Sequence, residues 1–192
     1  PFPDVNLALK EPNGLIAIGG ELSTERLLDA YSKGIFPWYS EGEPILWYSP
    51  DPRMVITPDR FRLSKSMAKI MRLERFEVRK NSNFDKVINL CRNVVRPDQN
   101  ATWIDDDMVN AYCVLHQKGF AHSIETYEEG ELVGGLYGVA LGEVFFGESM
   151  FALETYASKV AFVTLVVRLQ SFDFRLVDCQ VQTDHLTPFA AE

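Results

Sequence analysis

Hydrophobic and polar residues follow two different periods along this chain. Several segments before Gly119 place apolar residues three or four apart, which is typical of amphipathic helices. Beyond Gly119 the period changes to two, which is typical of strands. The pattern predicts helices over residues 23–34, from 64 onward, and over 83–93, 105–119 and 155–170. It predicts strands over residues 45–48, 54–57, 76–79, 121–127, 132–140, 143–149 and 175–181.

Small polar residues and glycines mark where several of these helices begin and end. Ser23 and Asp105 can each accept a hydrogen bond from the first turn of a helix. Gly34 and Gly119 follow two of the predicted helix ends, where glycine tolerates a left-handed backbone. We expect another helix to begin at Ser64.

The order of the predicted elements indicates an α/β protein. Three consecutive strands, then a helix that is apolar around most of its girth, then a buried strand fit a three-layer domain over residues 56–192. Residues 1–55 form a small appended unit with helix and strand signals. A chain of 192 residues is long enough for both parts.

The segment from residue 36 to residue 53 is rich in aromatic residues and prolines. It holds Trp38 and Trp47, each followed by a tyrosine and a serine, and four prolines that keep most of it from being helical. Flat side chains on a stiff backbone can stack on bases, sugars or peptides. The alternative is a connection whose tryptophans fill a core, and both interpretations stay open at this point.

Charge is distributed unevenly along the chain. The net charge is −8, yet residues 60–80 hold eight basic side chains against two acidic ones, a balance of +6. Within the predicted helix Lys65, Lys69 and Arg72 share one face, opposite apolar residues. A basic face inside an acidic protein is typical of a nucleic-acid contact or of a solvated surface.

Cysteine spacing and hydropathy restrict the cellular location and the kinds of partner that we expect for the protein. The three cysteines are widely spaced and form no Cys-x-x-Cys pair, which disfavours a zinc site and a disulfide framework. No apolar run approaches the roughly 18 residues that a membrane span needs, and no signal segment opens the chain. We therefore expect a cytoplasmic protein without a membrane or metal partner.

Two strands carry polar residues that are candidates for chemistry. Glu148 lies among aromatic residues, and its desolvation would raise its pKa; a surface glutamate at a strand end is the alternative. Asp178 and Gln180 stand two apart, so on a strand they share one face. They could bind a substrate amine or form a structural polar pair.

Several common catalytic and binding motifs do not occur. No spacing identifies a Ser-His-Asp or Cys-His set. The long predicted helix is entered through Ala-Leu-Glu-Thr at residues 152–155, which is acidic and not glycine-rich. This entry argues against binding of a nucleotide or coenzyme A pyrophosphate at that helix.

A set of ordered motifs covers nearly the whole chain. They are Pro-Asn-Gly-Leu at 12–15, Gly-Gly-Glu-Leu at 19–22, Gly-Ile-Phe-Pro-Trp at 34–38, Leu-Trp-Tyr-Ser-Pro-Asp-Pro-Arg at 46–53, Thr-Trp-Ile at 102–104, His-Ser-Ile-Glu at 122–125, Leu-Val-Gly-Gly-Leu-Tyr-Gly at 132–138, Gly-Glu-Ser-Met-Phe at 147–151 and Asp-Cys-Gln at 178–180. Together they closely resemble the bacterial leucyl/phenylalanyl-tRNA–protein transferases.

This resemblance implies a fold and a reaction. The larger domain is expected to be GCN5-related N-acetyltransferase-like (an acyl-CoA N-acyltransferase fold). The reaction moves leucine or phenylalanine, and methionine less well, from Leu-tRNA or Phe-tRNA to proteins with N-terminal Arg or Lys. The product enters N-end-rule degradation in the cytoplasm. The donor tRNA is a substrate, so no cofactor is expected, and we expect a monomer.

The resemblance also implies roles for individual residues. Catalytic roles fall on Asp178 and Gln180, with Asp178 positioning or deprotonating the attacking amine through Gln180. Substrate-binding roles fall on Trp38 and Trp103 for the terminal adenosine, on Glu148 for the basic acceptor, and on a donor pocket of Met150, Phe145, Leu136 and Val177. Contacts with tRNA phosphates fall on Lys65, Lys69 and Arg72.

Two departures and two other functions have to be weighed against the resemblance. Thr183 stands where some family members have Asn, and family members continue past Glu192 with a further helix, so the larger domain is expected to lack its C-terminal end. An acyl-CoA N-acetyltransferase would share the fold but should bind coenzyme A. A non-catalytic binder of basic N-termini would use Glu148 without any chemistry.

Overall fold

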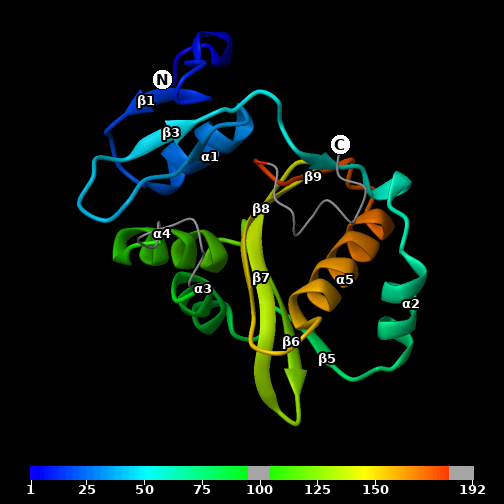
Figure 1. Cartoon of the computed structure of the whole chain (residues 1–192). Coiled ribbons are helices and arrows are strands. Elements are labelled where there is room, and N and C mark those ends of the chain that lie inside the picture. The colour runs from blue at the N-terminus through cyan, green and yellow to red at the C-terminus, as the bar shows by residue number, and fades with distance from the viewer. Residues whose placement is uncertain (95–103, 182–192) are drawn as a thin grey trace.

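The computed structural model describes residues 1–94 and 104–181 as a mixed α/β fold with two sheets (Figure 1). A three-stranded sheet has the order β1-β3-β2, and a six-stranded sheet has the order β4-β9-β8-β7-β6-β5. The predicted α/β class is therefore confirmed. Trp103 and Thr183, which are discussed in the sequence analysis, lie outside the described residues.

The three-stranded sheet and one helix form the N-terminal unit. After a short 3-10 turn η1 (Val5–Leu7), its elements are β1 (Leu15–Ile18), α1 (Thr24–Ser32), β2 (Phe36–Pro37) and β3 (Leu46–Tyr48). Strand β3 pairs with both β1 and β2 in antiparallel fashion. The aromatic segment thus lies in strands and a connecting loop, as its prolines require, whereas β1 was not predicted.

The six-stranded sheet forms the centre of the larger part. Its strands are β4 (Val55–Ile56), β5 (Glu77–Lys80), β6 (Ala121–Glu128), β7 (Glu131–Leu141), β8 (Val144–Ala152) and β9 (Leu176–Asp178). All neighbouring pairs are antiparallel except β8 and β9, which are parallel. The long helix between β8 and β9 provides the crossover that a parallel pair requires.

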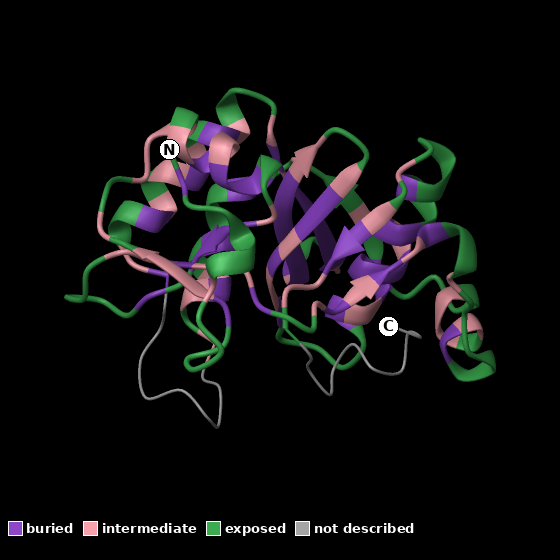
Figure 2. Ribbon diagram, turned by 90° about the horizontal axis from the view of Figure 1, so that it is seen from above, coloured by how far each residue is buried: buried purple, intermediate pink, exposed green. Residues whose placement is uncertain are grey.

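Helices cover both faces of this sheet (Figure 1). α3 (Phe84–Arg92) and α4 (Asp106–Gln117) lie on one face, and α5 (Ala157–Ser171) lies on the other. α2 (Lys65–Arg72), which follows the 3-10 turn η2 (Pro58–Arg60), lies beyond α5 on that second side. Buried residues concentrate on the central strands, between the two helical layers (Figure 2).

The helix starts agree with the sequence predictions. Ser23 accepts a hydrogen bond from the amide of Arg26, and Ser64 accepts one of 3.2 Å from Met67. Asp105 accepts one of 2.8 Å from Met108 at the start of α4. Each side chain satisfies an amide that has no partner within its helix, which explains why the helices begin where they do.

Two hydrophobic clusters fill the spaces on either side of the larger sheet. The first joins α1, β2 and β3 of the N-terminal unit to α3, α4 and one face of the sheet. The second packs α5 and part of α2 against the other face. The N-terminal unit therefore shares its core with the α3–α4 side of the larger part.

A bulge in β8 decides where Glu148 points. Tyr137 pairs with Ser149 and Gly138 with Gly147, so Glu148 has no opposite partner in β7. An extra residue of this kind interrupts the alternation of faces along a strand. Glu148 consequently lies on the α4 side of the sheet, whereas Met150 packs against the α5 side.

Strand β9 is shorter than predicted. It ends at Asp178, and Gln180 has a left-handed backbone with φ of +64°. The prediction of a strand to residue 181, in which Asp178 and Gln180 share a face through regular alternation, is therefore wrong. Left-handed backbone is unfavourable for a residue with a Cβ atom, so surrounding contacts must hold this turn.

Candidate active site

Glu148 is a buried carboxylate that tyrosines and an amide surround. The residue is 8% exposed. Its Oε1 atom accepts a hydrogen bond of 2.7 Å from the hydroxyl of Tyr31 and one of 3.1 Å from Nε2 of Gln180. Its Oε2 atom accepts a longer one of 3.3 Å from the hydroxyl of Tyr112. The alternative of a surface glutamate is excluded.

The environment of Glu148 brings its pKa into the neutral range. Burial raises the pKa to about 7, and the negative charge of Asp178 adds to this rise. Hydrogen bonds from Tyr31, Gln180 and Tyr112 act in the opposite direction because they favour the carboxylate. A carboxyl group with such a pKa can take up and release a proton near neutral pH.

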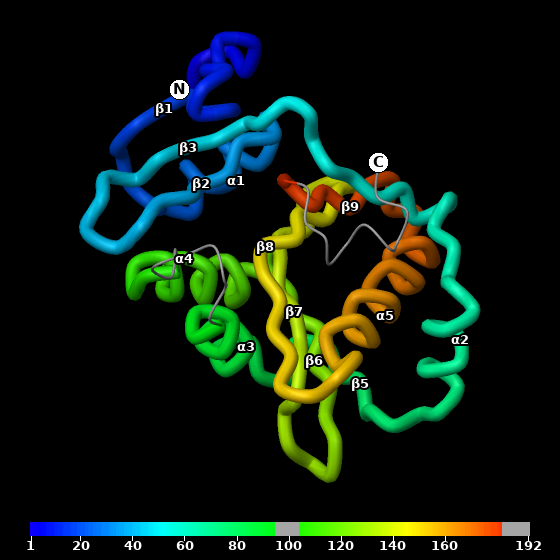
Figure 3. The backbone as a smooth tube through the Cα atoms, in the orientation of Figure 1, coloured from blue at the N-terminus to red at the C-terminus, as the bar shows by residue number. Residues whose placement is uncertain are grey.

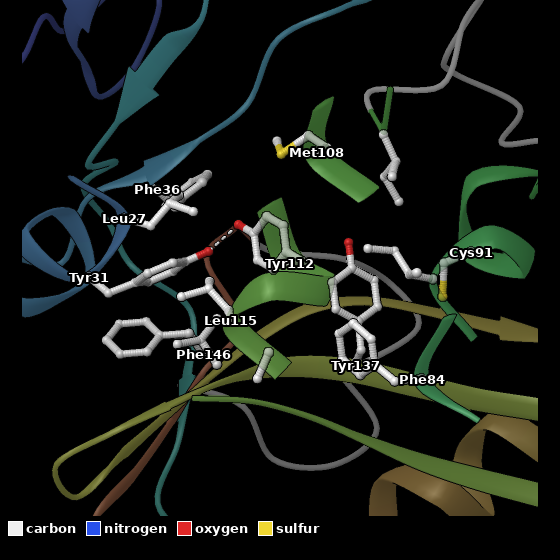
Figure 4. Packing of buried hydrophobic residues seen from close by; sticks show 14 of the residues in the cluster. Leu27, Tyr31, Phe36, Phe84, Cys91, Met108, Tyr112, Leu115, Tyr137 and Phe146 are labelled. Atoms are coloured by element: carbon white, nitrogen blue, oxygen red, sulfur yellow. Dashed lines mark hydrogen bonds between the residues drawn. The ribbon is translucent and has the colours of Figure 1, made fainter. Parts of the chain in front are cut away.

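Tyr31 and Tyr112 form a pair of buried hydroxyls beside this carboxylate. Their hydroxyls are hydrogen-bonded to each other, and the two side chains meet from α1 and α4 (Figure 4). Each hydroxyl has one proton, so the two hydroxyls cannot make all three of these bonds at the same time. When Tyr31 donates to Glu148, the proton of Tyr112 goes either to Tyr31 or, over the longer distance of 3.3 Å, to Glu148. Burial, followed by the nearby Glu148 carboxylate, raises the pKa of both tyrosines, which therefore remain proton donors at neutral pH.

Asp178 is held by an arginine from the connection between the two parts of the chain. Nε and Nη2 of Arg53 donate hydrogen bonds of 2.8 and 2.7 Å to its two carboxylate oxygens. The backbone amide of Gln180 donates a third bond, of 2.8 Å, to Oδ1. The guanidinium also lies 4.8 Å above the ring of Phe36. This geometry is the bidentate arrangement that arginine forms best with carboxylates.

Gln180 connects these two carboxylates. Its backbone amide is bonded to Asp178 and its side-chain amide to Glu148. Asp178, Gln180 and Glu148 therefore form one hydrogen-bonded group where β8 and β9 approach the N-terminal unit (Figure 3). The structure brings together the three polar residues that the sequence singled out.

The cysteine between Asp178 and Gln180 is poorly suited to act as a nucleophile. Burial, with the charge of Asp178 as a second cause, raises the pKa of Cys179 to about 12. Burial and the hydrogen bond to Asp85 likewise raise the pKa of Cys113 to about 12. Both thiols are therefore protonated at neutral pH, where a thiolate would be needed.

The four residues predicted to line a donor pocket lie on the α5 side of the sheet. Leu136, Phe145 and Val177 are buried within the second hydrophobic cluster, and Met150 packs against it. Leu136 pairs with Met150, and Phe145 pairs with Val177 across the β8–β9 junction. They form a contiguous apolar group on the opposite face from Glu148, and their role as a pocket stays a prediction.

The two tryptophans of the aromatic segment have different surroundings. Trp47 is 0% exposed, donates a hydrogen bond of 2.9 Å to the carbonyl of Gly19 and packs edge-on against Phe2. Trp38 is 38% exposed and stands edge-on to Tyr48 at 5.7 Å between ring centroids. Trp47 is thus a core residue, while Trp38 offers an aromatic surface to solvent.

The basic face of α2 is exposed. Lys65, Lys69 and Arg72 all reach solvent on this helix. Farther along the same basic stretch, Arg75 is engaged with Glu128 and Glu154. The three helix residues make no hydrogen bond or ion pair with any other part of the chain that the structure describes, so their charges face solvent.

Arg53, Tyr31 and Tyr112 complete the site but were not predicted to belong to it. Tyr31 and Tyr112 occur at ordinary core positions of amphipathic helices, and Arg53 lies 125 positions from its partner Asp178. The only signal in the sequence was that a buried carboxylate needs a partner of opposite charge or several donors.

The part of the chain that the structure describes holds neither a metal-ligand cluster nor a membrane-spanning helix. Within residues 1–94 and 104–181, no group of three or more His, Cys, Asp or Glu side chains could hold a metal ion. In the same ranges, no helix combines the length and the hydropathy that crossing a bilayer requires.

Comparison with known proteins places the chain in a family. Residues 55–192 match the family model described as leucyl/phenylalanyl-tRNA protein transferase, and residues 20–51 match that of its N-terminal domain. The chain belongs to this family. It is 57% identical to the leucyl/phenylalanyl-tRNA–protein transferase of Myxococcus xanthus (strain DK1622), over 100% of this chain and 81% of the relative. It is 53% identical to that of Nitrosospira multiformis, over 99% of this chain and 82% of the relative.

Membership identifies the protein as an aminoacyltransferase, which confirms the predicted enzyme class. Among solved structures, the transferase is similar to a GCN5-related N-acetyltransferase from Kribbella flavida, with a TM-score of 0.43 and 8% identity over 84% of this chain and 57% of that one. This similarity concerns the fold alone, and the assignment of the reaction rests on the family.

Proposed function

We propose that this transferase moves leucine or phenylalanine, and methionine less well, from Leu-tRNA or Phe-tRNA to the α-amino group of proteins that begin with Arg or Lys. The product would be marked for N-end-rule degradation. The observation that carries this proposal is the buried carboxylate of Glu148, which Gln180 holds beside the Arg53–Asp178 ion pair.

The reaction is the aminolysis of an ester. The α-amine nitrogen of the acceptor attacks the carbonyl carbon of the aminoacyl group, and a C–N bond forms. The bond between that carbon and the ribose oxygen of the terminal adenosine breaks. One proton leaves the amine, and the ribose oxygen takes up a proton as the hydroxyl is released. Because the ester is already activated, the enzyme has mainly to position the two substrates and to manage protons, and no cofactor is needed.

Glu148 is suited to receive the proton of the acceptor's α-ammonium group. A free α-amino group has a pKa of about 8, and Glu148 has a pKa of about 7. Proton transfer between two such groups is nearly balanced, which is the condition under which general base catalysis works best. The negative charge also suits an acceptor that carries the additional charge of Arg or Lys.

Asp178 and Gln180 are proposed to act as an orienting pair. Both carboxylate oxygens of Asp178 are bonded to Arg53, so protonating Asp178 would disrupt that ion pair. Its bond to the backbone of Gln180 instead fixes the residue whose amide contacts Glu148. Of the two roles left open by the sequence, orientation is the one that these contacts favour.

Two regions are proposed to bind the tRNA part of the donor. Trp38 offers an exposed ring on which the terminal adenosine can stack, and Trp103 is expected to contribute a second ring. The exposed charges of Lys65, Lys69 and Arg72 suit the phosphates of the tRNA.

The donor's side chain needs an apolar pocket. The group formed by Leu136, Phe145, Met150 and Val177 is proposed to accept leucine or phenylalanine, with the flexible Met150 adapting to both shapes. This group lies on the α5 side of β8 and β9, on the opposite face from Glu148. We further propose that the enzyme is cytoplasmic and monomeric and works without a metal ion.

The reaction can be tested with purified protein, radiolabelled Leu-tRNA and short peptides of one sequence. Peptides that begin with Arg or Lys are expected to become labelled. The same peptide with Glu in first place, and an Arg peptide with an acetylated α-amine, are the matched controls and should remain unlabelled. Equal labelling of the Glu peptide would overturn the proposed acceptor preference, and labelling of the acetylated peptide would overturn attack by the α-amine.

A further inference from the structure

Arg53 lies in the connection between the N-terminal unit and the larger part of the chain. Its side chain points to Asp178, which belongs to the hydrogen-bonded group of Asp178, Gln180 and Glu148. Arg53 follows β3 in the connection that runs over β9 toward β4 (Figure 3). Its side chain is 19% exposed and that of Asp178 is 6% exposed, so the ion pair is largely withdrawn from water. The ring of Phe36 covers the guanidinium at 4.8 Å. An arginine so enclosed has few other orientations available.

The backbone on both sides of this ion pair is held as well. Val55 pairs with Asp178, the amide of Cys179 donates a bond of 2.9 Å to the carbonyl of Met54, and the amide of Met54 donates one of 3.4 Å to the carbonyl of Gln180. The side chain of Arg53 and the backbone of the neighbouring Met54 therefore hold the same turn.

The turn needs this support because of its conformation. Gln180 has a φ of +64°, and its amide bond to Oδ1 of Asp178 is one of the contacts that keep it there. That oxygen can remain in place only while the carboxylate is fixed, and Arg53 fixes it through both oxygens. Loss of the guanidinium would free Asp178 to rotate, and the Gln180 amide would lose its acceptor.

We propose that Arg53 is a positioning residue for aminoacyl transfer: through Asp178 it sets the backbone turn that directs the side-chain amide of Gln180 to Glu148. This inference rests on the proposed role of Gln180. Arg53 itself touches no reacting atom, so its contribution should appear in the rate of the chemical step and not in the binding of the donor.

The experiment compares Arg53→Lys, Arg53→Ala, Asp178→Ala and the double variant. We expect Arg53→Ala to lower kcat by about 10- to 100-fold, with KM for Leu-tRNA changed by less than about threefold. Arg53→Lys keeps the charge but loses the bidentate geometry, and should recover part of the loss. Arg53→Ala should add little to the loss caused by Asp178→Ala, because both act through one contact.

Arg175→Ala is the matched control. Arg175 forms an ion pair of 2.5 Å with Glu143 at the other end of β9, where both side chains are largely exposed. Its removal should leave kcat unchanged. This result would show that losing an arginine ion pair near β9 is not enough to slow the reaction, and that the loss in Arg53→Ala is specific to the pair with Asp178.

A second measurement needs no substrate. Amide hydrogen exchange in a peptide covering residues 176–181 should become faster in Arg53→Ala, because the Gln180 amide loses its acceptor. Unchanged exchange, or additive losses of kcat in the double variant, would overturn the inference. Wild-type protein that labels no peptide at all would overturn the proposed function instead, while the exchange result would still decide the role of Arg53 in fixing the turn.

Discussion

The hydroxyl of Tyr31 donates a hydrogen bond of 2.7 Å to Oε1 of Glu148, which lies 117 positions farther along the chain. Tyr31 belongs to α1 of the N-terminal unit, and Glu148 belongs to the bulge in β8. The carboxylate of Glu148 therefore obtains part of its stabilisation from a different part of the chain, and its full environment exists only when the N-terminal unit is packed in place.

Replacing Tyr31 by Phe should shift the pH dependence of the reaction. The hydrogen bond from Tyr31 lowers the pKa of Glu148, so its removal should raise that pKa above about 7. If the ionised carboxylate is the active form, the acid limb of the kcat profile moves to higher pH by about one unit. Transfer rates from pH 5.5 to 9 provide the measurement. Tyr156→Phe, at an exposed tyrosine, is the control and should leave the limb where it is.

Glu148 should make the protein less stable as the pH rises. Its pKa is about 7 in the folded protein against 4.5 as the usual value. Between these two values the folded state holds a proton that the unfolded state has lost, so the stabilisation present below pH 4.5 declines until the pH exceeds about 7.

Glu148→Gln removes this titration. The stability of the variant relative to wild type should increase by on the order of 1 to 3 kcal/mol between pH 4.5 and 7.5, as measured by urea unfolding. Other titrating groups occur in both proteins and cancel in the difference. A difference that is flat across this range would show that Glu148 titrates normally.

The two tryptophans should respond differently to truncation. Trp47→Ala removes a fully buried ring and its hydrogen bond to Gly19, and should cost about 3 to 5 kcal/mol of the free energy of unfolding. Trp38→Ala should cost less than about 1 kcal/mol because the ring is partly exposed. Trp38→Ala should nevertheless raise KM for Leu-tRNA. Equal destabilisation by both changes would contradict the distinction between core and surface.

Neutralising the basic face of α2 should weaken tRNA binding and its dependence on salt. Changing Lys65, Lys69 and Arg72 together to Gln should remove the three proposed phosphate contacts, so the slope of log affinity against log salt should become shallower by about 2 to 3. Changing three other exposed lysines to Gln gives a control with the same net charge: Lys10, Lys86 and Lys118. An equal effect of both triple changes would mean that only overall charge matters.

The helices and the strand meander could be predicted from the sequence because their signals are local. Ser23, Ser64 and Asp105 cap the helices that they were expected to cap. The burial of Glu148 was also predictable, since aromatic residues flank it in the chain. Strand β1 was not predicted, because it depends on pairing with β3, which lies about 30 residues farther along the chain.

The partners within the site could not be predicted, because they depend on contacts between distant segments. The pairing of Arg53 with Asp178 and the approach of Tyr31 to Glu148 require the packing of the N-terminal unit. The left-handed backbone of Gln180 likewise follows from contacts with Asp178 and Met54 and not from its residue type. Asp178 and Gln180 were correctly placed together, but by a turn and not by the alternation of a strand.

The most direct test is the single-turnover rate of transfer from Leu-tRNA to an Arg-starting peptide in Glu148→Gln. The amide keeps the shape of the side chain and cannot accept the proton. We predict a rate constant lower by at least about 100-fold, with the affinity for Leu-tRNA within about threefold of wild type. A rate constant equal to that of wild type would contradict the account, as would a loss that the weaker binding of Leu-tRNA explains entirely.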